Sequence, residues 1–438
     1  MSEANLMDKV VALAKRRGFI FPSSEIYGGL ANTYDYGPLG VELKNNIKNL
    51  WWNRFVHRRD DIVGIDAALI MNPKVWEVSG HLEKFIDPLV ECPKCQARFR
   101  ADQLPYDLNK KGDWLCTNCN EGVLTDPRTF NLMFKTFIGP AEEAANVAYL
   151  RPETAQAMFV DFKNILDSTR VSLPFGIAQI GKAFRNEITP GNFIFRTREF
   201  EIMEIEYFIR QEDWKRYFEE WRKETRSWID EVGINLDKVH EVEIGEEERA
   251  HYSERTIDFE YDYPFGQKEL YGLAYRTDFD LRNHEKSSGQ NLKYKDPETG
   301  EEFWPHVIEP AWGVDRTMLT VLLDAYTEED DRIILKLKPK LAPYKAAVFP
   351  LLANKPELIS LARKIYDDLR QYFPTAWDDR GNIGKRYYSQ DEIGTPYCVT
   401  VDFDSLEDKS VTVRDRDSME QKRVKIEKLV DYLKEKLN

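Results

Sequence analysis

Apolar and polar residues alternate over several long stretches of the chain. Residues 177–209 read almost throughout as strand, and residues 255–281 and 303–311 repeat that pattern. Helical spacing occurs over residues 211–234, and Gly313 precedes a second helical run. Because the strands follow one another with few helices between them, we predict an antiparallel sheet and an α+β fold.

A break in regular structure falls at residues 336–343, where two prolines interrupt alternating lysines. Beyond it, strands alternate with helices, including a helix over residues 358–369 and a terminal helix over residues 419–436. We therefore expect a small α/β domain at residues 341–438 after a larger unit at residues 1–340.

Length and charge narrow the class of protein. The 438 residues include ten tryptophans, no signal peptide and no stretch of transmembrane length, so we expect a cytoplasmic protein without a membrane partner. A net charge of −14 argues against nonspecific nucleic-acid binding through a global positive field. Two local basic clusters are either solvated surface or binding faces: Lys336, Lys338, Lys340 and Lys345, and Arg414, Arg416, Lys422, Arg423 and Lys425.

Four of the five cysteines form one pattern, in which Cys92 and Cys95 are separated by twenty residues from Cys116 and Cys119. Two such pairs let four thiolates converge on one tetrahedral ion, which predicts a closed, structural zinc site. The alternatives are a chance arrangement or two disulfides, and disulfides suit an oxidising compartment that we do not expect here.

The segment at residues 184–200 reads as two antiparallel strands joined by a turn at Pro190, Gly191 and Asn192. Guanidinium groups near a turn suit phosphate or carboxylate oxygens, and Phe195 offers a flat face for a nucleobase. The segment therefore predicts a nucleotide site, with a solvated, salt-bridged hairpin as the alternative. The arginines are Arg185, Arg196 and Arg198, and the glutamates that could pair with them are Glu187, Glu199 and Glu201.

Further segments change the interpretation of that hairpin. Residues 306–316 run from a strand through a glycine into a helix that carries an arginine, and residues 149–156 place a glutamate beside a proline. The hairpin and the late strand–helix segment together resemble motifs 2 and 3 of class II aminoacyl-tRNA synthetases. Within that class the chain resembles the dimeric glycyl-tRNA synthetases of bacteria over almost its full length, in segments 29–40, 151–156, 184–187, 198–200, 269–270, 307–310, 381–385 and 413–416.

The resemblance implies a class II antiparallel catalytic sheet of six or seven strands flanked by helices, then an α/β anticodon-binding domain. We expect a zinc-binding insertion at residues 88–125 and a helical or mixed insertion at about residues 211–260. The implied protein is a homodimer that binds glycine and tRNA(Gly). The alternatives are another class II synthetase, a catalytically silent nucleic-acid-binding paralogue that would have lost its ATP-contacting arginines, and a zinc-stabilised nucleotide-binding protein without tRNA.

The implied reaction joins glycine and ATP into glycyl-adenylate and pyrophosphate, and then passes the glycyl group to tRNA. By resemblance, Arg185 holds the α-phosphate, Phe200 stacks on adenine, Arg316 holds the γ-phosphate, and Glu269 is a candidate ligand for Mg²⁺. The full set of implied ATP-binding residues is Arg185, Asn186, Glu187, Phe195, Arg196, Thr197, Arg198, Glu199, Phe200, Glu269, Leu270, Gly313, Val314, Asp315 and Arg316.

The resemblance also places the glycine ammonium among Glu153, Glu204 and Glu309, with Arg276 on the carboxylate side. If Glu204 is considered alone, it could instead be a surface residue of a strand with no ligand. Three carboxylates in one place are costly without a cation between them, so they are more typical of a site that binds a cationic ligand than of a protein core. The implied glycine-binding residues are Arg100, Glu153, Phe200, Glu201, Ile202, Met203, Glu204, Arg276, Glu309, Pro310, Ala311, Trp312 and Gly313.

Two positions depart from the family pattern. Ala311 stands where the family usually has serine, and the segment between Asp280 and Phe303 is shorter than in many relatives. We expect glycine still to be preferred, because a pocket can reject larger amino acids by steric clash and glycine has no smaller competitor. A separate editing domain is therefore not required.

Overall fold

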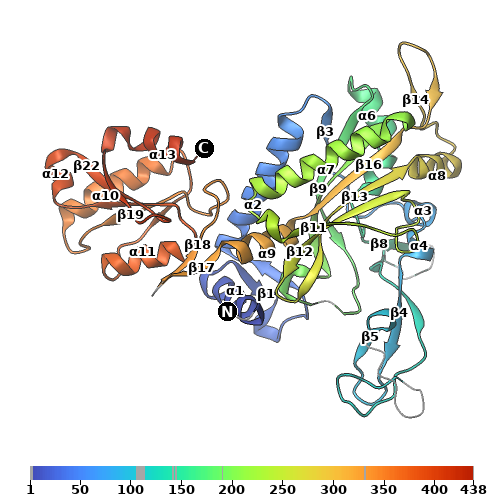
Figure 1. The fold of residues 1–438 in the computed structure, drawn as a ribbon, viewed down its shortest axis with the longest axis horizontal. Helices are drawn as coiled ribbons and strands as arrows, with labels where there is room; N and C mark the ends of the chain where they lie inside the picture. Colours follow the sequence, from blue (N-terminus) through green and yellow to red (C-terminus); the bar gives the residue numbers. More distant parts are fainter. Residues whose placement is uncertain are drawn as a thin grey trace.

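The structure is a computed structural model that describes residues 3–104, 114–140, 143, 146–189, 191–329 and 332–437. A larger N-terminal unit lies beside a smaller C-terminal unit (Figure 1). Within these ranges no helix is long and apolar enough to cross a membrane.

The larger unit is built around a seven-stranded sheet with the order β11-β12-β13-β16-β10-β9-β3. Neighbouring strands are antiparallel, except that β3 runs parallel to β9. This arrangement confirms the predicted α+β fold. The strands are β3 (Ile62–Gly64), β9 (Phe175–Phe184), β10 (Glu199–Ile209), β11 (Val239–Glu243), β12 (Arg255–Tyr263), β13 (Gly266–Thr277) and β16 (His306–Gly313).

Helices cover both faces of this sheet. On one face α2 (Pro38–Trp52), α7 (Trp214–Glu231) and α9 (Val314–Ala325) contribute to the main hydrophobic core. On the other face α5 (Ala155–Val160), α6 (Phe162–Ser168) and α8 (Phe279–Ser288) enclose a second core around Phe208. Because side chains alternate along a strand, Phe208 shares its face with the residues two and four positions earlier, which are both glutamates.

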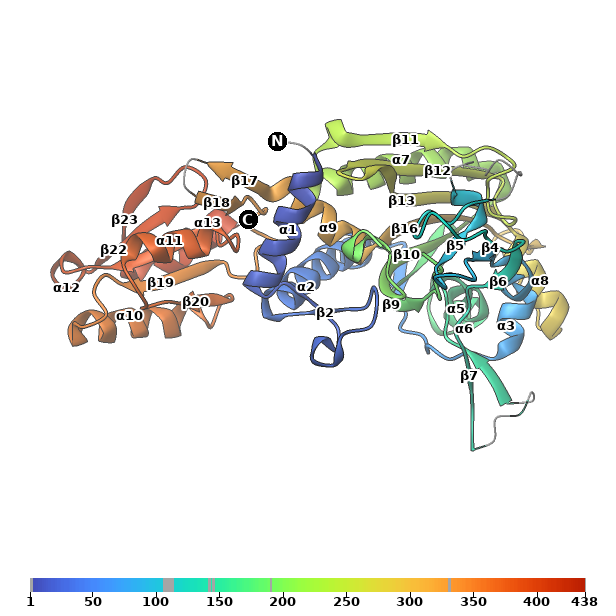
Figure 2. The ribbon, with the colours of Figure 1, turned by 90° about the horizontal axis from the view of Figure 1, so that it is seen from below.

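Further elements of the larger unit lie outside the seven-stranded sheet. The N-terminal helix α1 (Glu3–Arg17) leads into the pair β1 (Ile20–Pro22) and β2 (Tyr34–Tyr36). A three-stranded sheet of β4 (Ile86–Glu91), β5 (Arg98–Arg100) and β6 (Arg128–Asn131) lies away from the main sheet (Figure 1). Strand β7 (Lys135–Phe137), paired with β8 (Val147–Tyr149), projects from the body of the unit (Figure 2).

The segment after β9 differs from the predicted hairpin. β9 ends at Phe184 and β10 begins at Glu199, so most of the second predicted strand is a loop with a single 3₁₀ turn. The reason is local, since Asn192 and Phe193 have φ values of 57° and 58°, which a strand cannot accommodate. Pro190 lies outside the described residues.

The smaller unit contains a five-stranded sheet with the order β20-β19-β21-β22-β23. Its strands are β19 (Ala346–Pro350), β20 (Thr375–Trp377), β21 (Tyr397–Val401), β22 (Ser410–Asp415) and β23 (Gln421–Lys425), and its helices are α10 (Pro356–Leu369), α11 (Ile383–Asp391), α12 (Asp404–Asp408) and α13 (Leu429–Leu437). The predicted helix over residues 419–436 is therefore wrong in its first part. β23 is a charged strand paired only with β22, and in it only Val424 is buried, so its apolar signal is too weak to reveal a strand.

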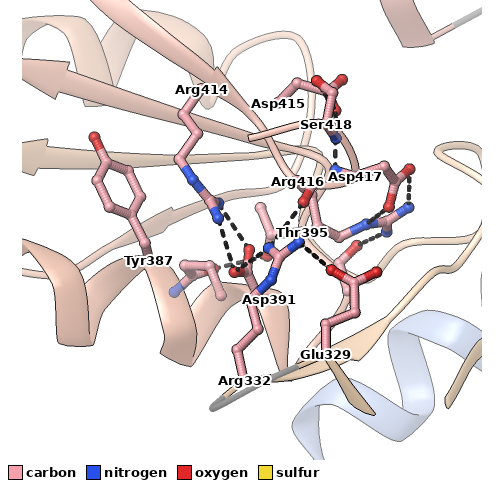
Figure 3. Close-up of polar contacts among 12 residues, drawn as sticks. Glu329, Arg332, Tyr387, Asp391, Thr395, Arg414, Asp415, Arg416, Asp417 and Ser418 are labelled. Carbon is pink, nitrogen blue, oxygen red and sulfur yellow. Dashed lines mark hydrogen bonds and ion pairs between the residues drawn. The ribbon is translucent and has the colours of Figure 1, made fainter. Parts of the chain in front are cut away.

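The hairpin of β17 (Tyr326–Glu329) and β18 (Arg332–Leu335) connects the two units. Its Arg332 donates to Asp391 of α11 at 3.0 Å, and Arg414 of β22 donates to the same carboxylate at 2.8 and 2.9 Å (Figure 3). Arg416 donates to the carbonyl of Leu337 at 2.9 Å. These arginines are buried, so the basic surface expected around Arg414 and Arg416 is wrong at both positions.

Lys345 also differs from the predicted basic surface. Its ammonium group donates to the carbonyl oxygens of Pro339, Lys340 and Ala342 at 2.6–3.0 Å. Burial lowers the pKa of Lys345 to about 8. The lysine therefore fixes the connection between the units instead of offering charge to a partner.

Replacing Asp391 with alanine should lower the free energy of unfolding by about 3–5 kcal/mol, because two buried arginines lose their carboxylate. Denaturant unfolding followed by circular dichroism measures the decrease. Asp417→Ala is the matched control, since that carboxylate is 54% exposed in its pair with Arg416 and should change stability by at most about 1 kcal/mol. Equal effects in the two variants would contradict the role assigned to Asp391.

Candidate functional site

A cavity of about 370 Å³ opens on the α5/α8 face of the seven-stranded sheet. Its walls come from β10, β13 and β16, from the loop between β9 and β10, and from the segment between β11 and β12. The predicted site residues that line it are Glu153, Arg185, Glu187, Phe195, Arg196, Thr197, Phe200, Glu201, Ile202, Glu204, Glu269, Leu270, Glu309, Ala311, Trp312, Gly313, Asp315 and Arg316.

One end of the cavity is rich in arginine. Arg316, in the first turn of α9, forms an ion pair with Glu269 at 3.0 Å and donates to the carbonyl of Phe195 at 3.3 Å. Arg185 donates from Nε to the carbonyl of Pro152 at 3.1 Å, and its guanidinium lies 5.3 Å from the ring of Phe200. These groups form a positively charged wall suited to phosphate oxygens.

Phe195 does not present the free stacking face that the hairpin pattern suggested. Its ring is buried against Tyr263 and Phe265, at centroid distances of 5.0 and 5.1 Å, and Arg316 lies 4.5 Å above it. The ring therefore supports Arg316 from behind. Phe200 is only partly buried and lines the cavity, so it is the better placed of the two for stacking on a base.

Two carboxylates, those of Asp258 and Glu269, line the cavity on the side of Arg316. The neighbouring guanidinium keeps the pKa of Glu269 below its usual value. Burial, together with the charges of Glu269 and Glu260, raises the pKa of Asp258 to about 7. Asp258 lines the cavity but has no recognisable motif around it, so the sequence did not reveal it. Paired carboxylates of this kind are the oxygen ligands that Mg²⁺ prefers.

The opposite end of the cavity is acidic. Glu153, Glu204 and Glu309 line it, and each has a separate hydrogen-bond donor. Thr154 donates to Glu204, and Arg276 donates to Glu309 at 2.8 Å. For Glu153 the donors are His81, at 3.1 Å, and Gln156, at 3.1 Å.

Arg276 lies behind the acidic wall and does not itself line the cavity. It is fully buried on β13, where it pairs with Glu309 and with Asp280 of α8, whose two oxygens lie 3.0 and 3.1 Å from it. The resemblance implies that Arg276 lies on the side of the substrate carboxylate, whereas here its guanidinium lies behind the glutamates of the cavity wall. In this structure the guanidinium orients Glu309.

The segment between β11 and β12 supplies part of the cavity wall that sequence reasoning missed. Tyr252 is in this segment, and its ring lies 3.7 Å from the guanidinium of Arg276. The segment is rich in charged residues and reads as a solvated loop, which gave no signal of its position. Its other cavity-lining residues are Ile244, Glu248, Arg249 and Ala250.

Several predicted residues lie outside the cavity wall. Arg198 donates to the carbonyl of Ala31 at 2.7 Å, Glu199 pairs with Lys182, and Arg100 pairs with Asp87 at 3.1 Å. Other predicted residues that do not line the cavity are Asn186, Met203, Pro310 and Val314.

A buried lysine of α2 holds the base of the arginine end of the cavity. Lys44 lies 3.1 Å from Asp315 and 2.9 Å from Glu201, and Tyr36 donates to Asp315. The second oxygen of Asp315 accepts the backbone N–H of Glu201 at 2.7 Å. Helix α9, which carries Arg316, is thereby fixed to strand β10.

The four patterned cysteines meet at the end of the β4/β5/β6 sheet. Their sulfur atoms all lie within 4.8 Å of one another, with Cys92 and Cys119 3.8 Å apart and Cys95 and Cys116 3.6 Å apart. Thiolates bound at about 2.3 Å to a tetrahedral zinc ion are separated by about 3.8 Å, so these residues fit that ion. All five cysteines are free thiols, which excludes the disulfide alternative.

The chain is similar to known proteins over almost its full length. Residues 136–326 match the family described as tRNA synthetase class II core domain (G, H, P, S and T), and residues 345–436 match the family described as Anticodon binding domain. The chain is 52% identical to the glycine–tRNA ligase of Caldanaerobacter subterraneus subsp. tengcongensis over 98% of both chains. It is 50% identical to the glycine–tRNA ligase of Alkaliphilus oremlandii over 100% of both chains, and 50% identical to that of Thermobifida fusca over 100% of this chain and 99% of the relative.

Proposed function

Because this chain belongs to the glycine–tRNA ligase family of class II aminoacyl-tRNA synthetases, we propose that its cavity is where glycine is activated with ATP and passed to tRNA(Gly). The observation that carries this proposal is the opposite charge of the two ends of one cavity, arginine at one and glutamate at the other. ATP brings phosphates and glycine brings an ammonium group, so the two substrates suit the two ends. A catalytically silent paralogue would have no reason to keep Arg185, Arg196 and Arg316 along this wall.

At the arginine end, the glycine carboxylate attacks the α-phosphate of ATP in line with the departing pyrophosphate. We propose that Arg185 neutralises the charge that develops on the α-phosphate, Phe200 stacks on adenine, and Arg316 holds the γ-phosphate. Glu269 and Asp258 would hold Mg²⁺, which when bound shares the negative charge of the phosphates. No general acid or base is needed in this step, because an ionised carboxylate is already the nucleophile.

At the acidic end, Glu153, Glu204 and Glu309 receive the ammonium group of glycine. Their charges attract the cation, while rejection of larger amino acids depends on the space left around its α-carbon. Ala311 lines this part of the cavity and supplies an apolar methyl group to its wall, whereas the ring of Trp312 is fully buried in the main core on the other face of the sheet. Ala311 offers a methyl group where the family usually has a hydroxyl, so exclusion here depends on shape.

We further propose that residues 1–340 form the catalytic unit and residues 341–438 the unit that binds the anticodon. Zinc bound by the four cysteines would stabilise the insertion at residues 88–125. A homodimer is supported by the loop between β1 and β2, where Ile26 and Tyr27 are each 87% exposed and Leu30 is 63% exposed, because a lone subunit gains nothing by presenting these side chains to water. We also propose a cytoplasmic location, because translation there consumes the charged tRNA.

Glycine-dependent exchange of pyrophosphate into ATP tests the assignment of Arg185. Arg185→Ala should lower the exchange rate by about 10²–10³-fold, because one charged donor to the transition state is lost. Arg198→Ala is the matched control, since that guanidinium bonds a carbonyl outside the cavity, and it should retain most of the activity. Unchanged exchange in Arg185→Ala, with the fold retained by circular dichroism, would refute the role.

The same assay with other amino acids tests the wall formed by Ala311. Glycine should support exchange at least about 10²-fold better than alanine, since a methyl group on the α-carbon would clash with the pocket. Ala311→Ser should keep this preference. Appreciable exchange with alanine in the unaltered protein would count against shape as the source of discrimination.

Metal analysis of the purified protein tests the cysteine site. About one equivalent of zinc should be present, and Cys116→Ser should lose it, because three thiolates no longer close the tetrahedron. Cys398→Ser is the control: that thiol lies in β21, far along the chain from the site, and its loss should leave the zinc content unchanged. Protein that binds no zinc at all would contradict the proposal.

A further inference from the structure

Glu206 is a buried acid that the proposed reaction leaves without a role. It lies on β10, two residues beyond Glu204 and on the same face of the strand. Its side chain is 0% exposed, and neither of its carboxyl oxygens has a hydrogen-bond partner among the described residues. The cavity wall does not include it, so it lies beneath the acidic end of the pocket.

The acids nearest to Glu206 already have donors. Carboxyl oxygens of Glu204, Glu206 and Glu309 all lie within 4.8 Å of one another. Thr154 donates to Glu204, and Arg276 donates to Glu309. Glu206 is therefore the member of this group that receives no donor from the described part of the chain.

The charge count in this region cannot be balanced with every acid ionised. Glu153, Glu204, Glu206, Glu309 and Asp280 together bring five carboxyl groups, and Arg276 is shared between two of them. His81 can offset Glu153 when it is protonated, and glycine adds one ammonium group. Burial and mutual repulsion raise the pKa values of Glu204, Glu206 and Glu309, so this group holds at least one proton. A buried carboxylate without a partner costs several kcal/mol, and Glu206 is the acid of this group whose two oxygens have no donor among the described residues, so protonation stabilises it most.

The groups facing Glu206 from each neighbouring element agree with this assignment. They are Glu204 on its own strand, Glu309 on β16, Arg276 on β13 and Asp280 on α8, while its register partner on β9 is the apolar Ile177. Burial first, and then the negative charge of Glu309, raise the pKa of Glu206 well above its usual value.

We infer that Glu206 is a neutral carboxylic acid that positions the glycine-binding carboxylates. Its O–H donates to Glu204 or Glu309, which holds these two acids in place without adding a further negative charge. Glu206 is thus a positioning residue beneath the ammonium site and does not touch the substrate. The inference rests on the proposed function for its link to glycine, but the protonation state can be tested without it.

Two substitutions separate a neutral donor from a charged group. Glu206→Gln keeps the shape and an N–H donor, so the KM for glycine in the exchange assay should stay within about threefold of the unaltered protein. Glu206→Met keeps the volume but removes the donor, and it should raise the KM for glycine by roughly tenfold while the KM for ATP stays unchanged. Glu204→Gln, which removes a proposed ammonium ligand, is the reference for losing a charge.

Either of two results would overturn the inference. If Glu206→Gln raises the KM for glycine as much as Glu204→Gln does, Glu206 acts as a charged carboxylate. If Glu206→Met leaves both KM values unchanged, Glu206 only fills space.

The pH dependence of thermal stability gives a second readout that does not need activity. An acid whose pKa is raised on folding contributes stability below its unfolded pKa of about 4.3, and that contribution is lost as pH rises toward the folded pKa. Glutamine does not titrate, so the melting temperature of Glu206→Gln relative to the unaltered protein should rise from about pH 5 to about pH 8. A difference that is constant with pH would overturn the assignment even if Glu206→Met fails to fold. Absence of glycine-dependent exchange in the unaltered protein would instead refute the proposed function.

Discussion

The acidic end of the cavity depends on one buried cation, Arg276. Its guanidinium holds Glu309 and Asp280 at once, and the ring of Tyr252 lies 3.7 Å from it while that of Phe159 lies 5.1 Å from it. Strand β13, helices α5 and α8 and the segment between β11 and β12 therefore meet at one side chain. Removing a partner from a buried ion pair is far more costly than never having built the pair, so these elements cannot move apart independently.

The seven-stranded sheet explains how two opposite charges come to share one cavity. Along β10 every second residue points to the same face, which gives the order Phe200, Ile202, Glu204, Glu206 and Phe208. Alternate residues are about 7 Å apart on a strand, so Phe200, proposed to stack on adenine, and Glu204, proposed to bind the ammonium group, are separated by about 13 Å. That distance accommodates an adenosine and a small amino acid side by side. The spacing between the two proposed substrate positions therefore follows from the pleat of β10, and the loops complete the walls of the cavity.

The sequence predicted those features that depend on short-range patterns. The alternation in β10, the helix after Gly313 and the cysteine spacing all follow from local chemistry, and each is present in the structure. What it could not predict depends on tertiary contacts. In the sequence Arg414 is typical of a charged surface residue, and only the tertiary structure places Asp391 of α11 beside it. Tyr252 and Asp258 belong to no motif, and their place in the cavity wall is decided by how β12 pairs with β13.

The position of Phe195 likewise could not be predicted from the sequence. An aromatic residue beside arginines suggests a stacking surface, yet positive φ angles at Asn192 and Phe193 turn the loop and bury the ring. Lys44 then ties the base of that arginine wall to α2 through Asp315 and Glu201. These buried ion pairs join α2 directly to strand β10 and to the first turn of α9. A rigid connection of this kind makes the orientation of Arg316 sensitive to how α2 is packed.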